Sequence, residues 1–199
     1  MAKTRIPTQK RSIEKKNRII EKGFEIICEK GYYNISTPDI AKAADVSTGI
    51  IYQYFTDKKE IFVEGMKNYS YNIMFPVLKI LEKSNLSQDN MKNILNEIID
   101  VYIKHHMTAK KAHKELVAMS NLDDEILQII KDNELLLTKK LVEALERNNI
   151  SIKNPTEKMH ILIGIIENLC HEIVYHKHAD LDNNIMKEEV LNLLTYLLK

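Results

Sequence analysis

The chain has 199 residues, of which 44% are hydrophobic and 29% are charged, and its formal net charge is +1 at pH 7. This composition is typical of a soluble globular protein and excludes collagen-like, disordered and highly charged classes. The longest apolar run without a charge, residues 161–166, is far too short to cross a membrane. We therefore expect one or two folded domains, no membrane partner and a cytoplasmic location.

The N-terminal segment is the most basic part of the chain. Residues 1–22 hold eight Lys or Arg and two Glu, and residues 1–11 are expected to form a flexible basic arm. No apolar segment of a secretory signal is present there. Cys28 and Cys170 lie in apolar helical stretches without a paired framework, which favours a reducing compartment and a packing role.

Residues 37–59 carry the most informative pattern, which is typical of two short helices around a tight turn. Thr37 stands where an N-cap is favoured, and Pro38 follows at the first helical position, where its missing N–H costs nothing. Ala41 and Ala44 are small enough to let a second helix cross closely. The spacing therefore predicts a first helix that supports a second one.

The second short helix is predicted over residues 48–55, with Ser47 as its cap. Ile51 and Phe55 are four residues apart and share the face that packs on the core. The other faces carry side chains that can meet a partner, namely Thr48, Gly49, Tyr52 and Gln53. A helix displayed in this way fits the major groove of DNA. A generic helical corner of an all-α protein is the alternative reading of the same spacing.

The next helix is predicted to begin at Asp57, with Glu60 three residues later completing a capping box. Lys58 and Lys59 in its first turn oppose the helix dipole. A phosphate held jointly by these lysines and the exposed N–H groups would offset that cost. This arrangement again indicates nucleic acid, to which the basic N-terminal arm can add phosphate or minor-groove contacts.

Residues 20–62 resemble the N-terminal domain of the TetR (tetracycline-repressor-like) family of bacterial transcriptional regulators. The positions that match the family pattern in register are Phe24, Gly31, Thr37, Ile40, Ala41, Ala44, Val46, Ser47, Gly49, Ile51, Tyr52, Tyr54, Phe55, Lys58 and Ile61. One departure is Asp45, which replaces the usual glycine of the turn. Because Asp tolerates a left-handed backbone better than most residues, we expect the turn to be kept.

The resemblance assigns roles to individual positions. Positions that usually hold phosphates are matched by Thr37, Tyr52, Tyr54 and Lys58. Positions that usually face base edges are matched by Thr48, Gly49 and Gln53, and a glutamine can read adenine through two hydrogen bonds. The predicted DNA-binding set is therefore Thr37, Ser47, Thr48, Gly49, Tyr52, Gln53, Tyr54 and Lys58.

Beyond residue 60 the chain shows strong helical periodicity and none of the alternation typical of strands. We predict an all-α fold of about nine helices: three in a DNA-binding head, one connector over residues 58–83 and five in the body. Pro76 lies inside the connector and is expected either to kink that helix or to end it at Phe75. A bend there could transmit a change from body to head, or it could be static.

Two apolar helices are predicted near the C-terminus, over residues 155–178 and 185–198. The first is apolar around most of its circumference, so it is either a central core helix or a helix buried against a second copy. In the resembling family the last two helices form the interface of a homodimer. The predicted dimer residues are Ile165, Leu169, Ile173, Val190, Leu194 and Leu197.

The resemblance also implies that the body binds a small-molecule effector that releases DNA. The candidates are polar or aromatic side chains that interrupt apolar faces: Tyr69, Tyr102, His106, His113, Asn168, His171 and Tyr175. Asn168, His171 and Tyr175 share a helical stripe with Gly164. This stripe could instead be the solvated face of the helix or part of the dimer interface.

No metal site, cofactor or enzymatic activity is predicted. His105 and His106 are adjacent and point to different faces, while His171, His176 and His178 lack the i,i+4 spacing of paired ligands. The sequence also shows no Ser/His/Asp or Cys/His arrangement with supporting context.

The domains are predicted as an arm over residues 1–11, a helix-turn-helix DNA-binding domain over residues 12–57, and an effector-binding and dimerisation domain over residues 58–199. The expected function is a dimeric, sequence-specific transcriptional regulator. The simplest form of it is a ligand-responsive repressor of a palindromic DNA operator. An architectural DNA binder on the same fold is an alternative, which binding sites away from promoters would favour.

Overall fold

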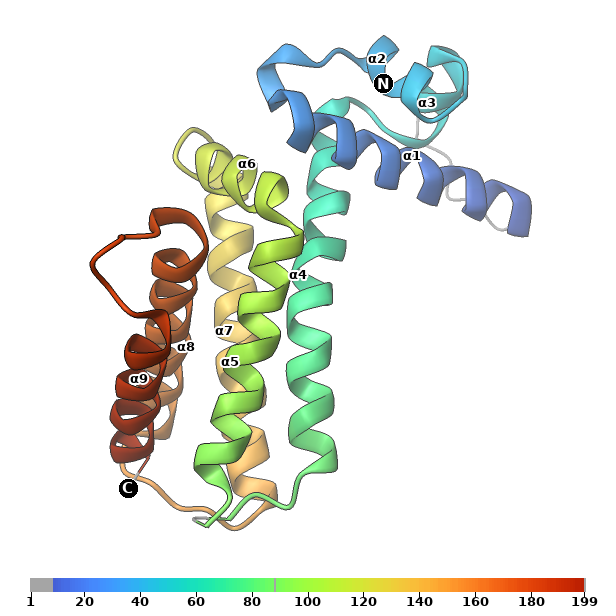
Figure 1. Ribbon diagram of the computed structural model, residues 1–199. Helices are drawn as coiled ribbons and strands as arrows, with labels where there is room; N and C mark the ends of the chain where they lie inside the picture. Colours follow the sequence, from blue (N-terminus) through green and yellow to red (C-terminus); the bar gives the residue numbers. More distant parts are fainter. Residues whose placement is uncertain (1–8, 88, 199) are drawn as a thin grey trace. The chain divides into compact units, whose positions relative to one another are not determined.

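The computed structural model describes residues 9–87 and 89–198, and these residues form only helices, turns and irregular segments (Figure 1). The all-α prediction is therefore confirmed, with nine α-helices, a 3₁₀-helix and a π-helical turn in the described ranges. The elements are α1 Lys10–Lys30, η1 Tyr32–Asn34, α2 Thr37–Ala43, α3 Thr48–Tyr54, α4 Lys58–Lys83, α5 Met91–Thr108, α6 Lys110–Ser120, α7 Asp124–Arg147, α8 Pro155–His171, η2 Glu172–His176 and α9 Asn183–Leu197.

The chain divides into two compact units. The first holds the described residues up to Tyr71 together with residues 110–127, and the second holds residues 72–109 and the described residues from Gln128 onward. This division differs from the predicted boundary after residue 57, because α4 and α7 each contribute residues to both units. The predicted arm lies mostly outside the described residues, and its last two positions already belong to α1.

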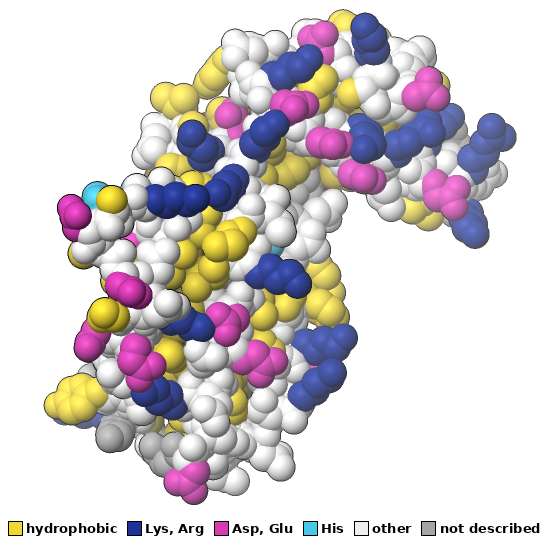
Figure 2. Space-filling view, viewed as in Figure 1, with side chains coloured by type: hydrophobic (Ala, Val, Ile, Leu, Met, Phe, Trp, Pro, Cys, Tyr) yellow, Lys and Arg dark blue, Asp and Glu magenta, His cyan; other side chains and the backbone are white. Residues whose placement is uncertain are grey.

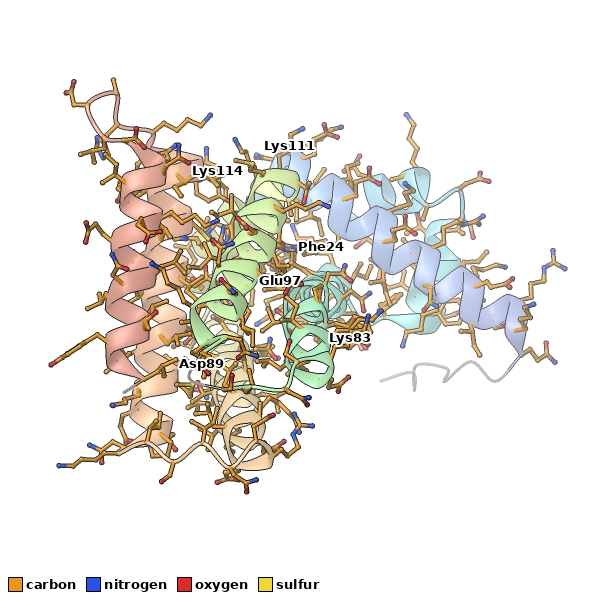
Figure 3. The ribbon with its side chains drawn as sticks, turned by 60° about the horizontal axis from the view of Figure 1, so that its bottom comes forward. Phe24, Lys83, Asp89, Glu97, Lys111 and Lys114 are labelled. Carbon is orange, nitrogen blue, oxygen red and sulfur yellow. The ribbon has the colours of Figure 1, made fainter. Side chains whose placement is uncertain are left out.

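The core of the first unit is formed by buried aliphatic and aromatic side chains of α1 to α4. These are Ile19, Ile20, Ile27, Ile40, Ile51, Phe55, Ile61 and Phe62. Two glycines let the helices approach closely. A Cβ on Gly23 would lie 2.7 Å from Cγ2 of Ile61, and a Cβ on Gly65 would overlap the side chain of Phe24. Figure 3 labels Phe24 where its side chain points from α1 toward α4.

The start of α2 differs from the prediction. Ser36 is the N-cap, and Thr37 is the first helical residue. The N–H of Ser36 donates to the Asp39 carboxylate at 2.9 Å, and the N–H of Asp39 donates to the Ser36 side chain in return. Both Ser36 and Thr37 are favourable caps, but only Ser36 has an acid three residues later to complete the capping box.

The turn between α2 and α3 is kept without glycine, as expected. Asp45 adopts a φ of 52°, in the left-handed region that aspartate tolerates. The N–H of Val46 donates to the carbonyl of Ala41 at 3.0 Å, which satisfies a carbonyl at the end of α2. Arg18 of α1 donates to the carbonyl of Asp45 at 3.4 Å. The turn is therefore fixed from both sides.

The start of α4 follows the prediction in part. The N–H of Glu60 donates to the Asp57 carboxylate at 2.9 Å, as a cap requires. The Glu60 carboxylate accepts from the N–H of Thr56 at 2.7 Å, so the reciprocal bond is shifted by one residue. α4 then continues through Pro76. The early helix end that we considered at Pro76 is therefore not found.

The second unit contains α5, which packs against α8 and α9, and these two helices also pack against each other (Figure 1). One apolar face of α5 is buried along its length: Met91, Ile94, Leu95, Ile98, Ile99 and Tyr102. The other helices add Leu137, Leu141, Leu145, Leu162, Ile166, Leu169, Leu191 and Leu194 to the same core. This unit therefore has a hydrophobic core of its own.

The helix predicted over residues 155–178 is interrupted. α8 ends at His171, and a π-helical turn follows until Lys177, whose φ of 50° ends it. α9 begins after Asp182, whose carboxylate accepts from the N–H of Asn184 at 2.7 Å. The last helix therefore lies close to its predicted bounds, whereas the preceding one is shorter than predicted.

Burial raises the pKa of the Cys28 and Cys170 thiols to about 12. Thiols that stay protonated are poor nucleophiles, so their environment agrees with a packing role. Within residues 9–87 and 89–198, no helix combines the length and the apolar character needed to span a membrane.

Candidate nucleic-acid interface

α3 is anchored on one side and open on the other. Ile51 and Tyr54 are buried, as is Phe55 at the end of the helix. Gly49 and Gln53 are exposed, and Tyr52 is 53% exposed. We call Gly49, Tyr52 and Gln53 the recognition face. These three residues leave one side of α3 accessible to a partner, and a helix with an accessible side can enter the major groove of DNA.

The other predicted DNA-binding residues lie in different environments. Ser47 is exposed and is the N-cap of α3, whereas Thr37 and Thr48 are half-buried at the first positions of their helices. Tyr54 is buried because it lies three residues after Ile51 and therefore shares its face. Tyr54 thus packs in the core and does not extend the recognition face.

Lys58 has partners inside the first unit. Its ammonium group donates to the carbonyl oxygens of Tyr32 and Ile35, at 2.7 Å each, and lies 4.3 Å from the centroid of the Tyr32 ring. Both carbonyls belong to the corner between α1 and α2. Lys58 therefore joins this corner to the start of α4.

Lys59 is also engaged within the first unit. Its ammonium group lies 2.7 Å from a carboxylate oxygen of Asp123 and 2.7 Å from one of Glu125. The Asp123 carboxylate also accepts from the N–H of Ile126 at 3.3 Å, which caps α7. The hydrogen bond from Lys59 is the main cause that holds the pKa of Asp123 below its usual range. Neither lysine is therefore a freely extended phosphate ligand.

α6 supports the same corner from another direction. The N–H of Tyr32 donates to the Glu115 carboxylate at 2.6 Å, and Lys111 donates to Glu29 at 2.9 Å. Figure 3 labels Lys111 on α6 beside the end of α1. Sequence reasoning missed these contacts because the partners are 83 and 82 residues apart. Local sequence patterns do not predict pairs at such separations.

Basic side chains gather on the first turns of α1. Arg11, Lys15 and Arg18 line a hollow of about 340 Å³ together with Glu14. Figure 2 shows Lys and Arg side chains gathered at this end of the first unit, with acidic side chains among them. Among the described residues that line this hollow, three are cationic and one is acidic, which suits the phosphate backbone of a nucleic acid. These residues were recognised in the sequence only as part of a basic segment.

The predicted effector residues divide between the two units. In the first unit, the Tyr69 hydroxyl lies 3.5 Å from Nδ1 of His113. In the second unit, Tyr102 is buried in the core, whereas Asn168 is exposed on α8. The predicted set is therefore not a single site within either unit.

The remaining effector candidates form a polar cluster in the second unit, which we define as His106, Glu167, His171 and Tyr175. Nε2 of the fully buried His106 lies 3.0 Å from a Glu167 carboxylate oxygen, and its Nδ1 lies 3.4 Å from the Tyr175 hydroxyl. Burial lowers the pKa of His171 and raises that of Tyr175 to about 12. Sequence reasoning missed Glu167, although its i,i+4 spacing to His171 was a usable signal.

The predicted dimer residues mostly face the interior of one chain. Leu169, Ile173 and Leu194 are buried, and Ile165, Val190 and Leu197 are half-buried. The exposed apolar side chains of α8 and α9 are instead Ile161, Ile185, Leu193 and Tyr196. The prediction chose the most apolar stripe of each helix, which is the stripe that packs into the core of the chain itself.

Residues 19–64 match the family model of bacterial regulatory proteins, tetR family. Over 55 residues the chain is 44% identical to the HTH-type transcriptional regulator HbdR of Aromatoleum sp. (strain CIB), a match that covers 28% of this chain and 24% of HbdR. Over 193 residues it is 24% identical to IcaR of Staphylococcus aureus, the negative transcriptional regulator of the biofilm operon icaADBC, covering 92% of this chain and 99% of IcaR. The chain thus matches about a quarter of HbdR and nearly all of IcaR.

Solved structures show the same fold along most of the chain. A TetR-family transcriptional regulator from Mesorhizobium loti has a TM-score of 0.75 at 16% identity, over 96% of this chain and 98% of that one. A transcriptional regulator from Saccharomonospora viridis in complex with choline has a TM-score of 0.68 at 16% identity, over 92% and 96%. At such identities the likeness concerns the fold alone.

We expect Lys58→Ala to lower the free energy of unfolding by about 1.5–3 kcal/mol, because two carbonyl groups lose a charged donor. Denaturant unfolding of the full chain measures this change. Lys114→Ala, which removes an exposed lysine of α6 in the same unit, is the matched control and should stay within about 0.5 kcal/mol of the wild type. Equal stability of the two variants would contradict the structural role of Lys58.

Proposed function

We propose that this chain, a TetR-family DNA-binding transcriptional regulator, is a ligand-responsive repressor that binds a palindromic operator as a homodimer. The observation that carries this proposal is the exposed recognition face on the anchored helix α3. The end-to-end similarity to IcaR, a negative regulator, supports repression. Because a bacterial operator would be reached in the cytoplasm, the proposal includes a cytoplasmic location.

The recognition face supplies two kinds of contact. Gln53 can accept from and donate to an adenine edge, and Gly49 lets the helix backbone approach the bases closely. Tyr52 is exposed beside them and can donate its hydroxyl to a phosphate. The basic hollow on α1 provides further phosphate contacts, which fix the register of the protein on the duplex without reading sequence.

We expect Gln53→Ala to relax sequence preference at one position of the operator half-site, at a cost of about 1–3 kcal/mol for the preferred base. Selection of bound sequences from a random oligonucleotide pool, at a stated salt concentration, identifies the operator. Titration of that operator and of its single-base variants then gives the change. Gln128→Ala, which removes an exposed glutamine of α7, should leave the preference unchanged. A wild-type protein that binds scrambled duplexes as tightly as its best site would refute the proposal.

A second copy of the chain is the partner that α8 and α9 suit. Ile161, Ile185, Leu193 and Tyr196 are exposed on these two adjacent helices, with Tyr196 77% exposed. Exposed large apolar side chains on two helices that pack side by side favour burial against a complementary face. A twofold axis makes the same patch contact itself and would bring two recognition helices to half-sites about 34–36 Å apart.

We expect Leu193→Glu to convert the dimer into a monomer at micromolar concentration, because it buries a charge in an apolar interface. Sedimentation velocity of the full chain measures the change, and operator affinity should fall with it. Leu135→Glu is the matched control, since Leu135 is 48% exposed on α7 whereas Leu193 is 51% exposed on α9. A wild-type protein that stays monomeric over the whole concentration range would exclude this interface.

We propose that the effector site includes the polar cluster of the second unit and that the effector is a small organic cation. The rings of His106, His171 and Tyr175 have centroids 5.6–5.9 Å apart, and the Glu167 carboxylate lies against His106. Aromatic rings beside a carboxylate favour a cation. A structural neighbour with the same fold was solved in complex with choline, which makes choline a suitable probe of this chemical class. To release DNA, the effector must bind the two states of the regulator with different affinities.

We expect choline, used as the probe, to weaken operator binding by about 5–150-fold, the usual range of allosteric coupling. Fluorescence anisotropy with a labelled operator measures the shift. Tyr175→Phe keeps the ring and should retain the response, whereas Tyr175→Leu removes the ring and should lose it. An unchanged operator affinity at saturating choline would refute the cation assignment and leave the DNA-binding proposal standing.

A further inference from the structure

Glu172, His176 and His178 converge in the second unit, at the end of the π-helical turn η2. Nδ1 of His176 lies 2.9 Å from one Glu172 carboxylate oxygen, and Nε2 of His178 lies 3.4 Å from the other. One ligand atom from each side chain can be chosen so that all three lie within 4.8 Å of one another. Two imidazoles and one carboxylate therefore already share a small volume.

The backbone brings this convergence about in two steps. Glu172 and His176 are four residues apart and therefore project from the same side of the turn. His178 would lie about 240° further around a continuing α-helix, away from Glu172. The left-handed residue Lys177, with its N–H bonded to the carbonyl of Glu172 at 3.0 Å, turns the chain back instead. Single π-helical turns of this kind occur frequently at functional sites.

The chemistry of the donor set restricts the occupant. Imidazole nitrogen suits zinc, copper, nickel and iron, whereas magnesium and calcium prefer an all-oxygen environment. Zinc bonds of about 2.0–2.2 Å place tetrahedral ligand atoms about 3.3–3.5 Å apart. The two histidine nitrogens lie 2.9 Å and 3.4 Å from different oxygens of Glu172, and one ligand atom from each residue can be chosen with all three within 4.8 Å, so small side-chain rotations would bring them to this spacing. The His176 and His178 side chains are 52% and 60% exposed, so they have room to rotate and an ion can enter from solvent.

We propose that Glu172, His176 and His178 form a binding site for zinc or a similar borderline divalent transition-metal ion, with water in the remaining coordination position. The sequence expectation of no metal site considered spacing between histidines only, and it therefore overlooked the carboxylate between them. The ion would link the end of η2 to the segment that leads into α9. The proposal is independent of the DNA operator and of the effector.

A metal-free account of the same cluster is an ion pair between Glu172 and protonated histidines. The hydrogen bond from His176 holds the pKa of Glu172 below its usual range, and this bond exists without any metal. Exposed ion pairs of this kind contribute little to stability. The two accounts differ in one measurable property, which is the affinity of the folded chain for zinc.

The test is a zinc titration of the tag-free, metal-free full chain in competition with a chromogenic chelator. We expect the wild type to bind one zinc ion per chain at this site. The variants His176→Ala and His178→Ala should lose this binding. Their affinity should fall at least about tenfold, since even partners outside the coordination shell cost that much. Glu172→Gln, which keeps the shape of the side chain, should weaken binding in the same direction.

His160→Ala is the matched control, because His160 is an exposed histidine on α8 that lies outside the cluster. It should bind zinc as the wild type does, and far-UV circular dichroism of all variants checks that they are folded. The proposal is overturned if the wild type does not bind zinc, or if the cluster variants bind as tightly as the wild type. It is also overturned if the control loses as much affinity as they do.

Discussion

The burial of Ile51, Tyr54 and Phe55 is the constraint on which the DNA-reading surface depends. α3 has only seven residues, and isolated helices shorter than about 12–15 residues are marginal in water. Its form and orientation therefore come from the anchor that these three side chains make in the first unit. Because successive residues of a helix point in different directions, Gly49, Tyr52 and Gln53 are then exposed to solvent. Core packing and display to a partner are two results of the same three buried side chains.

The lysines at the start of α4 show how charge is used inside this unit. Lys58 donates a hydrogen bond to each of two carbonyl groups at the corner between α1 and α2. Lys59 forms ion pairs with two acidic side chains at the start of α7. Residue type and position suggested phosphate ligands, since both lysines lie in the first turn of a helix. The partners that they contact within the first unit are distant in sequence, and the phosphate contact of Lys58 stays a prediction. Arg11, Lys15 and Arg18 on α1 are further cations that a polyanion could contact.

Features set by local sequence were predictable, and features set by distant partners were not. The phase of α3, the left-handed Asp45 and the cap at Asp57 follow from neighbours a few residues away. The choice between Ser36 and Thr37 as cap was also local, but it needed attention to the acid at the third helical position. The dimer residues on α8 and α9 stay a prediction, because apolar character alone does not distinguish a core from an interface, and Ile165, Val190 and Leu197 are only half-buried in a single chain. The position of His178 depends on the left-handed backbone of Lys177. Lysine, unlike glycine or asparagine, gives no sequence signal for that conformation.

The Asp123 carboxylate contacts the first turns of two different helices. Its carboxylate receives the N–H of Ile126 in the first turn of α7 and the ammonium of Lys59 in the first turn of α4. These are also the two helices that contribute residues to both compact units. A single carboxyl group is thus a common point of attachment for the first turns of α4 and α7. Loss of this carboxylate would therefore remove an acceptor from the first turn of α7 and from the Lys59 ammonium at the same time.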